Sequence, residues 1–258
     1  MSAASATEWL EAHEEDHVGS AASLNQYWYS APTIDSLVSV VRQHVLTDRQ
    51  PRHLSCAFVS TPSLFFALPK SERHTCRVFD FDRALGVGEP GYVFYDYNEP
   101  HNLPEDVQGA FECVVIDPPF ITADVWRLYA EAALKLLAPT GGLVMLTTVI
   151  ENAQLLKELL GVRPNIYLPS IPNLPYQYGV FTNFDAPQLS QPNPEVPHDP
   201  ETFLAAAQSS GGSTNAPSHE VRANEIPIKG AGASYDFEEL IRRAEAAEAA
   251  EAERAATG

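Results

Sequence analysis

Short apolar runs recur along the chain and are separated by segments whose apolar residues follow helical spacing. Such runs suit strands that are buried on both faces of a sheet. They cover residues 54–59, 76–81, 92–95, 111–116, 143–148, 165–168 and 179–184. Strands that alternate with helices predict a parallel sheet with right-handed crossovers.

Helices are predicted in the segments between most of these runs. Thr33 and Thr122 stand where they can cap helices, and Pro62 stands at a favourable first-turn position. The predicted helices cover residues 34–45, 62–68, 123–137 and 151–160. The last two runs have no long helix between them, so they predict an antiparallel edge hairpin. The pattern therefore fits an α/β fold with a Rossmann-like, seven-stranded and mostly parallel sheet, and periodicity alone would fit other α/β folds equally well.

The apolar pattern stops near Asp185, and this sets the predicted domain limits. A chain of 258 residues of which 45% are hydrophobic can bury one sizeable core. We predict a disordered acidic leader over residues 1–23 and one folded domain over residues 24–186. Residues 187–258 are rich in Pro at first and in Ala and Glu at the end, so we predict a disordered extension that finishes in a marginal acidic helix.

Composition and charge restrict the kinds of molecule and the compartment that this chain is suited to. The formal net charge of −18 and the pI of about 4.7 count against a large nucleic-acid footprint, although much of this charge lies in the terminal segments. The three cysteines have no metal-ligand spacing, so we expect buried core thiols, no metal and a reducing compartment. No signal peptide or 18-residue apolar stretch is found, which predicts a cytoplasmic protein without a membrane span.

Polar residues follow the first three predicted strands, where ligands of open α/β sheets bind. The first strand ends at Ser60, and a helix opens at Pro62, so backbone N–H groups there could face a polar group. No GxGxxG motif is present, which suits the phosphate-free methionine end of S-adenosylmethionine better than a dinucleotide. Asp80 and Asp82 follow the second strand and either could accept ribose hydroxyls; we favour Asp82. Asp96 could reach an adenine amino group.

The fourth predicted strand ends in Asp117, Pro118, Pro119 and Phe120, the most specific motif in the chain. Two consecutive prolines fix φ and remove N–H donors, so the turn offers hydrogen-bond acceptors. Asp117 and the Pro118 carbonyl could hold an amino group with its lone pair toward a methyl donor, and Phe120 could lie against a cationic amine or a planar base. The acceptor of such a turn could therefore be a lysine or the amino group of an adenine.

Five segments carry a resemblance to a known family through their order and spacing. They are Leu24-Asn-Gln-Tyr-Trp-Tyr-Ser30, Val59-Ser-Thr-Pro-Ser63, Phe79-Asp-Phe-Asp-Arg83, Phe94-Tyr-Asp-Tyr-Asn98 and Val115-Ile-Asp-Pro-Pro-Phe120. Together they resemble the eukaryotic lysine methyltransferases of translation elongation factor 1-alpha, which were first grouped with adenine-amino methyltransferases. The resemblance covers about 160 residues and departs from the family pattern in residues 169–178.

The resemblance implies a Rossmann-like methyltransferase domain, S-adenosylmethionine as cofactor and elongation factor 1-alpha as protein substrate. By position, the Asp117 turn would be catalytic, and Asp82 and Asp96 would contact the cofactor. The aromatic residues of the first segment would border the substrate pocket; they are Tyr27, Trp28 and Tyr29. Two alternatives stay open at this stage: an adenine-amino methyltransferase that acts on DNA or RNA, and a non-catalytic binding module.

Overall fold

A computed structural model describes residues 28–46, 54–139, 141–172, 174, 176–196 and 199–209. Within these residues seven strands form one sheet, in the order β3-β2-β1-β4-β5-β7-β6. The strands are β1 (Leu54–Val59), β2 (Cys76–Asp80), β3 (Tyr92–Phe94), β4 (Phe111–Ile116), β5 (Leu143–Thr148), β6 (Arg163–Pro164) and β7 (Gly179–Thr182). The first five strands pair in parallel, and β7 is antiparallel to both β5 and β6. The predicted Rossmann-like sheet with an antiparallel edge hairpin is confirmed.

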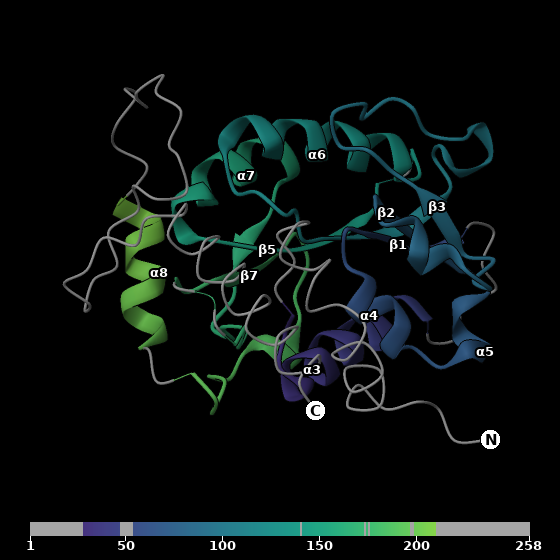
Figure 1. The fold of residues 1–258 in the computed structure, drawn as a ribbon. Helices are drawn as coiled ribbons and strands as arrows, with labels where there is room; N and C mark the ends of the chain where they lie inside the picture. Colours follow the sequence, from purple (N-terminus) through teal and green to yellow (C-terminus); the bar gives the residue numbers. More distant parts are fainter. Residues whose placement is uncertain are drawn as a thin grey trace, which may run out of the picture.

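Helices cover both faces of this sheet (Figure 1). One face carries α3 (Ala31–Val41), α4 (Pro62–Ala67) and α5 (Lys70–Arg73), and the other carries α6 (Ala123–Leu136) and α7 (Ala153–Leu160). Shorter helical turns are η1 (Arg42–Leu46), η2 (Arg83–Gly86), η3 (Glu105–Val107), η4 (Ile150–Asn152) and η5 (Pro187–Leu189). The last described helix is α8 (Pro200–Ser209).

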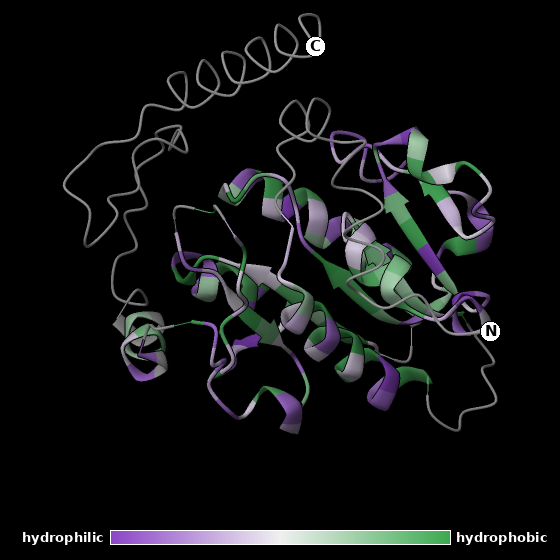
Figure 2. Cartoon of the chain, turned by 60° about the horizontal axis from the view of Figure 1, so that its bottom comes forward, coloured by the Kyte–Doolittle hydropathy of each residue, from purple (hydrophilic) through white to green (hydrophobic). Residues whose placement is uncertain are grey.

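The sheet separates two apolar cores because alternate residues of each strand point to opposite faces. In β1, Phe58 packs toward α3 and α4, whereas Val59 packs toward α6 and α7. Figure 2 shows the central strands mainly in the green of apolar residues. The three cysteines lie in register on adjacent strands, with Cys56 beside both Cys76 and Cys113. All three are buried free thiols, as the sequence predicted.

Two predicted helix starts have different outcomes. Thr122 caps α6, because its Oγ1 accepts a hydrogen bond from the Val125 backbone at 3.4 Å. The cap of α3 is Ser30 rather than Thr33, so the prediction for that helix was wrong by a few residues. Thr33 is fully buried and its Oγ1 accepts from the Ser170 backbone at 3.0 Å. Its hydroxyl is thus used to tie a distant segment to the helix.

The sixth strand is shorter and earlier than predicted. It consists of Arg163 and Pro164, whereas the apolar run 165–168 predicted a strand that begins two residues later. A proline is compatible with this position because β6 lies at the edge of the sheet. Tyr167 and Leu168 are buried, but Tyr167 hydrogen-bonds through its backbone to Leu189 instead of to β7. Their apolar character thus reflects packing beyond the sheet.

The segment after Pro187 contains regular structure within the residues described, which corrects the expectation of disorder for that part. Leu189 of η5 is buried against the α3 side of the sheet. In α8 the ring of Phe203 packs so closely on Gly179 of β7 that an added Cβ would lie 2.6 Å from it. The predicted leader and the predicted acidic helix near the C-terminus lie outside the described residues.

Candidate active site

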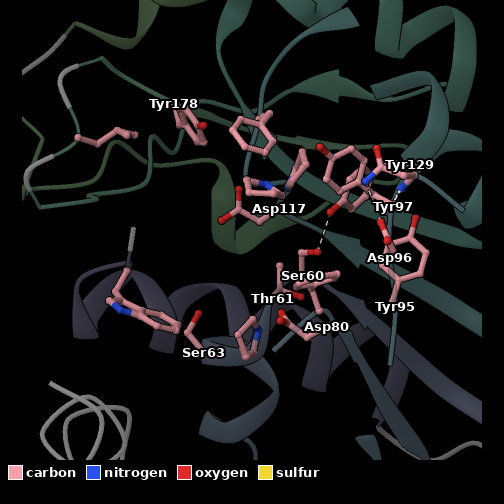
Figure 3. A pocket seen from close by; sticks show the side chains of 18 of the residues that line it. Ser60, Thr61, Ser63, Asp80, Tyr95, Asp96, Tyr97, Asp117, Tyr129 and Tyr178 are labelled. Atoms are coloured by element: carbon pink, nitrogen blue, oxygen red, sulfur yellow. Dashed lines mark hydrogen bonds between the residues drawn. The ribbon is translucent and has the colours of Figure 1, made fainter. Parts of the chain in front are cut away.

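A cavity of about 260 Å³ lies beside the carboxyl ends of β1, β2, β3 and β4 (Figure 3). Parallel strands end at the same edge of the sheet, so the polar residues that follow them meet there. The lining residues are Trp28, Ser60, Thr61, Pro62, Ser63, Asp80, Phe81, Tyr95, Asp96, Tyr97, Asn98, Asp117, Pro118, Pro119, Phe120, Tyr129, Leu174, Tyr176 and Tyr178. The cavity thus contains the Asp-Pro-Pro-Phe turn together with most of the predicted cofactor residues.

The first residue of the turn after β4 makes one more sheet hydrogen bond, and the chain then leaves the sheet. The Asp117 backbone donates to the Val59 carbonyl at 3.2 Å, and Pro118 and Pro119 have no N–H to donate further. Phe120 is 41% exposed, and its ring meets Tyr97 edge to face at 6.2 Å between centroids. The turn therefore presents acceptor oxygens and one exposed aromatic ring to the cavity.

The Asp117 carboxyl lies at the base of the turn in a poorly solvated position. Burial raises its pKa to about 7, and the hydroxyl of Tyr29 opposes this by donating to Oδ2 at 2.6 Å. Tyr29 also meets Thr147 of β5, with 2.6 Å between the two hydroxyl oxygens. A carboxyl group with a pKa near neutrality can exchange a proton at physiological pH.

The end of β1 is a strained turn that leads into α4. Ser60 has a φ of +54°, a left-handed conformation that is uncommon for residues with a Cβ. Its hydroxyl lies 2.8 Å from that of Tyr129 on α6. The next residue, Thr61, is buried, and its Oγ1 has no hydrogen-bond partner. The turn thus directs an unpaired hydroxyl toward the region where a ligand would lie.

The two carboxylates after β2 occupy different environments. Asp80 lines the cavity, is 6% exposed and has a pKa that burial raises to about 6. Asp82 does not line it, because the strand ends at Asp80 and the alternation of a strand no longer applies two residues later. The Asp82 carboxylate instead caps η2 by accepting from the Ala84 backbone at 2.9 Å. The structure therefore reverses our preference and favours Asp80 as the carboxylate that meets a ligand.

The end of β3 contributes one carboxylate and two phenols. Asp96 lines the cavity and accepts from the backbone and side-chain nitrogens of Asn98, both at 2.9 Å. Tyr95 is buried, and its hydroxyl has no hydrogen-bond partner. Tyr97 stacks on Tyr129 at 5.9 Å between ring centroids. The cavity wall here is aromatic with unpaired or exposed polar groups.

The predicted aromatic residues of the N-terminal segment divide between two positions. Trp28 lines the cavity. Tyr29 does not line it but is buried behind Asp117. Tyr27 lies outside the described residues.

Sequence reasoning missed the contribution of two other parts of the chain. Tyr129 lies within the predicted helix 123–137, and its contact with Ser60 depends on how α6 crosses the sheet. Leu174, Tyr176 and Tyr178 come from the segment 169–178, in which the chain departs from the family pattern. The rings of Tyr176 and Tyr178 are stacked at 6.0 Å. Two tyrosines two positions apart in a loop were the only sequence signal for this wall.

The charged side chains that line the cavity are all acidic. They are Asp80, Asp96 and Asp117, and no Lys, Arg or His occurs among the lining residues that the structure describes. An aromatic wall combined with carboxylates favours a cationic ligand or an amine over a phosphate. Within the described residues no group of His, Cys, Asp and Glu is arranged to hold a metal ion.

Comparison with known proteins identifies the family. Residues 20–186 match the family described as "Probable N6-adenine methyltransferase". The chain belongs to this family. The matched region contains the sheet and the described lining residues of the cavity.

Curated relatives in this family are named as protein-lysine methyltransferases. The chain is 30% identical to "EEF1A lysine methyltransferase 1" of Mus musculus over 171 residues, which cover 63% of this chain and 74% of that protein. It is 31% identical to the Bos taurus protein of the same name over 169 residues, with 63% and 70% covered. It is 32% identical to "Protein-lysine N-methyltransferase EFM5" of Saccharomyces cerevisiae over 123 residues, with 45% and 48% covered. The chain is thus an enzyme of the protein-lysine N-methyltransferase family.

None of the helices in the described part of the chain has the length and apolar character that crossing a membrane requires.

Proposed function

We propose that this enzyme uses S-adenosylmethionine to methylate a lysine of translation elongation factor 1-alpha in the cytoplasm. The observation that carries the proposal is the Asp117-Pro118-Pro119-Phe120 turn, which lies in the lining of an acidic, aromatic cavity at the carboxyl edge of the sheet. The names of the relatives support the choice of substrate.

The turn has the groups needed to hold a lysine amine. The Asp117 carboxylate and the Pro118 carbonyl can accept the N–H protons, which leaves the nitrogen lone pair free to point into the cavity. Phe120 and Trp28 offer aromatic surface for the aliphatic stem and for a residual positive charge. Positioning of this kind can supply much of the rate enhancement of a reaction between two bound groups.

A lysine ammonium must lose a proton before its nitrogen can react. The aromatic lining favours the neutral amine because burial disfavours the charged form. Asp117, with its pKa near 7, is suited to accept that proton at neutral pH. The same carboxyl group can thus orient the amine and remove its proton.

A separate observation, two buried hydroxyls without partners, is compatible with S-adenosylmethionine in this cavity. The hydroxyls of Thr61 and Tyr95 are buried without a hydrogen-bond partner, and such groups usually require one. Asp80 and Asp96 lie where they could accept from ribose hydroxyls and an adenine amino group. When bound, S-adenosylmethionine supplies a methyl group on a sulfonium, so the protein need form no covalent intermediate.

Methylation of adenine in DNA or RNA is the second candidate, because it matches the family description and the turn would suit a flipped base. The absence of basic residues in the described cavity lining and the net charge of −18 count against it, since nucleic-acid binding relies on cations near phosphates.

The test is transfer of a labelled methyl group from S-adenosylmethionine to purified elongation factor, to DNA and to RNA in separate reactions. We expect label in the elongation factor alone. The Asp117→Asn variant should lose at least 100-fold in kcat, the size of a general-base contribution of about 10² to 10⁴. The Asp82→Asn variant is the control, because it removes the same charge outside the cavity. Label in nucleic acid alone, or full activity of Asp117→Asn, would overturn the proposal.

A further inference from the structure

Three hydrogen-bonded side chains form a row in which Tyr29, from the segment before α3, lies between Asp117 of the turn and Thr147 of β5. Tyr29 is 2% exposed, and its hydroxyl donates to Asp117 Oδ2 at 2.6 Å. The same hydroxyl oxygen lies 2.6 Å from Oγ1 of Thr147, which is 3% exposed. The three groups come from sequence positions 29, 117 and 147, so only the folded chain brings them together.

We propose that Tyr29 is a positioning residue for Asp117, and that Thr147 completes a hydrogen-bond relay which orients the carboxylate toward the acceptor amine and favours its ionised form. The proposal rests on the proposed function, because it assigns Tyr29 a role through the carboxylate that is thought to hold the amine. Tyr29 itself does not line the cavity and would not touch either reactant.

The chemistry of the relay explains why a hydroxyl is needed at position 29. When Asp117 is ionised it can only accept, so Tyr29 donates to Asp117 and Thr147 donates to Tyr29. When Asp117 takes up a proton it can donate to the Tyr29 oxygen, and the Tyr29 proton can turn to Thr147. The three groups can therefore stay hydrogen-bonded to one another as the carboxyl changes charge.

Among the groups around Asp117, the hydrogen bonds of this relay are the main source of stabilisation for its negative charge. The ionisable groups that face the cavity with Asp117 are Asp80, Asp96, Tyr95, Tyr97, Tyr129, Tyr176 and Tyr178. Burial disfavours the negative charge of Asp117, and no cation lines the described cavity to offset it. A hydrogen bond donated to the charged form is thus the available means to favour it.

The position of Tyr29 is fixed through the residue that follows it. The backbone N–H of Ser30, the next residue, donates to the Ser170 carbonyl at 2.9 Å. The Ser30 hydroxyl donates to the Glu195 carboxylate at 2.6 Å. These contacts attach the short segment before α3 to two later parts of the chain. The hydroxyl of Tyr29 is therefore held at a fixed place relative to the turn.

The test is the Tyr29→Phe variant, which keeps the ring and removes the hydroxyl. We expect kcat at pH 7 to fall about tenfold, the size of one lost hydrogen bond to a charged group. The loss of this donor raises the pKa of Asp117, so the rise of kcat with pH should move to higher pH and the deficit should shrink near pH 9. Affinity for S-adenosylmethionine, measured by calorimetry, should be unchanged. Thr147→Val should shift the pH profile in the same direction by less.

Tyr167→Phe is the matched control, because Tyr167 is also buried and its hydroxyl donates to Thr33, away from the cavity. That variant should keep the pH profile of the unmodified enzyme. An unmoved profile in both Tyr29→Phe and Thr147→Val, or an equal loss at every pH, would overturn the relay. Should Asp117→Asn retain activity, the proposed function itself would fail. An inactive Asp117→Asn with unmoved relay variants would refute the relay alone.

Discussion

Two carboxylates that are close in the sequence can have very different surroundings in the folded protein. Asp80 and Asp82 are two residues apart, yet one is 6% exposed in the cavity lining and the other caps a short helix. A buried carboxylate that accepts hydrogen bonds from ribose hydroxyls would form strong, charge-assisted hydrogen bonds, because little water competes for it. The helix-capping carboxylate already has a partner in the Ala84 backbone.

We therefore predict that Asp80→Asn weakens binding of S-adenosylhomocysteine, the demethylated product, by tenfold or more, about the size of one hydrogen bond to a charged group. Asp82→Asn is the matched control, since an Asn at this position can still cap the helix, and its affinity should stay within about twofold. Titration calorimetry on the two variants makes the comparison. A larger loss in Asp82→Asn would restore the sequence-based preference for Asp82.

Some site residues could be predicted from the sequence and others could not, because only some of them depend on local backbone structure. The Asp-Pro-Pro-Phe turn could be found because two prolines after an apolar run fix the backbone locally. The choice between Asp80 and Asp82 depended on the residue at which β2 ends. Strand ends depend on pairing with neighbouring strands, which periodicity alone does not fix. Tyr29 could be recognised as aromatic, but its contact with Asp117 spans 88 positions and required the fold.

At the level of elements, the segment after β7 is the part that the sequence described least well. Its prolines suggested disorder, but Asn193 shows why residues 187–196 are held against the domain. Asn193 is 4% exposed, and its side-chain nitrogen donates to the Leu168 carbonyl at 2.9 Å. Its side-chain oxygen accepts from the Glu195 backbone at 3.0 Å. One polar residue thus pairs with backbone groups of two segments, including that of the buried Leu168. A composition-based argument does not detect such a contact.

We predict that Asn193→Ala lowers the free energy of unfolding by about 1–3 kcal/mol, because it leaves the Leu168 carbonyl and the Glu195 N–H without their partner. The melting temperature should fall by roughly 3–10 °C for a domain of this size. Asn102→Ala is a suitable control, since Asn102 is exposed and its side chain donates only to Glu99 among the described contacts. Equal melting temperatures for the two variants would show that the segment is not anchored by Asn193.

At the level of the whole molecule, the alternation of strands and helices predicted an α/β fold with a mostly parallel sheet, although not the residues of its sixth strand. Right-handed crossovers and short connections restrict the strand orders that such a pattern can adopt. The segment 169–178 was beyond this reasoning, because it has no periodic pattern and yet forms one wall of the cavity. The same architecture brings three carboxylates together at one edge of the sheet, which has a consequence for stability.

Burial of Asp80 and Asp117 should make the unliganded enzyme less stable as the pH rises. Their pKa values in the folded state are raised to about 6 and about 7, above those of the unfolded chain. Their contribution to stability is therefore complete below the unfolded pKa near 4, and it is lost as the pH rises through the folded values. Each unit of difference corresponds to about 1.4 kcal/mol. The proposed catalytic carboxyl group thus lowers the stability of the unliganded protein at neutral pH.

We predict that Asp117→Asn, although inactive, melts several degrees above the unmodified enzyme at pH 8 and approaches it at pH 5, where Asp117 is largely protonated in the folded state. An amide in place of the carboxylate removes the unfavourable burial of charge, and 1 kcal/mol corresponds to roughly 2–4 °C for a domain of this size. Calorimetric melting of cofactor-free protein across this pH range measures the effect, with Asp82→Asn as the control for loss of one negative charge. If the melting temperatures of Asp117→Asn and of the unmodified enzyme differ by the same amount at every pH, the pKa of Asp117 is the same in the folded and unfolded states. Its proposed role as a base near neutral pH would then have no physical basis.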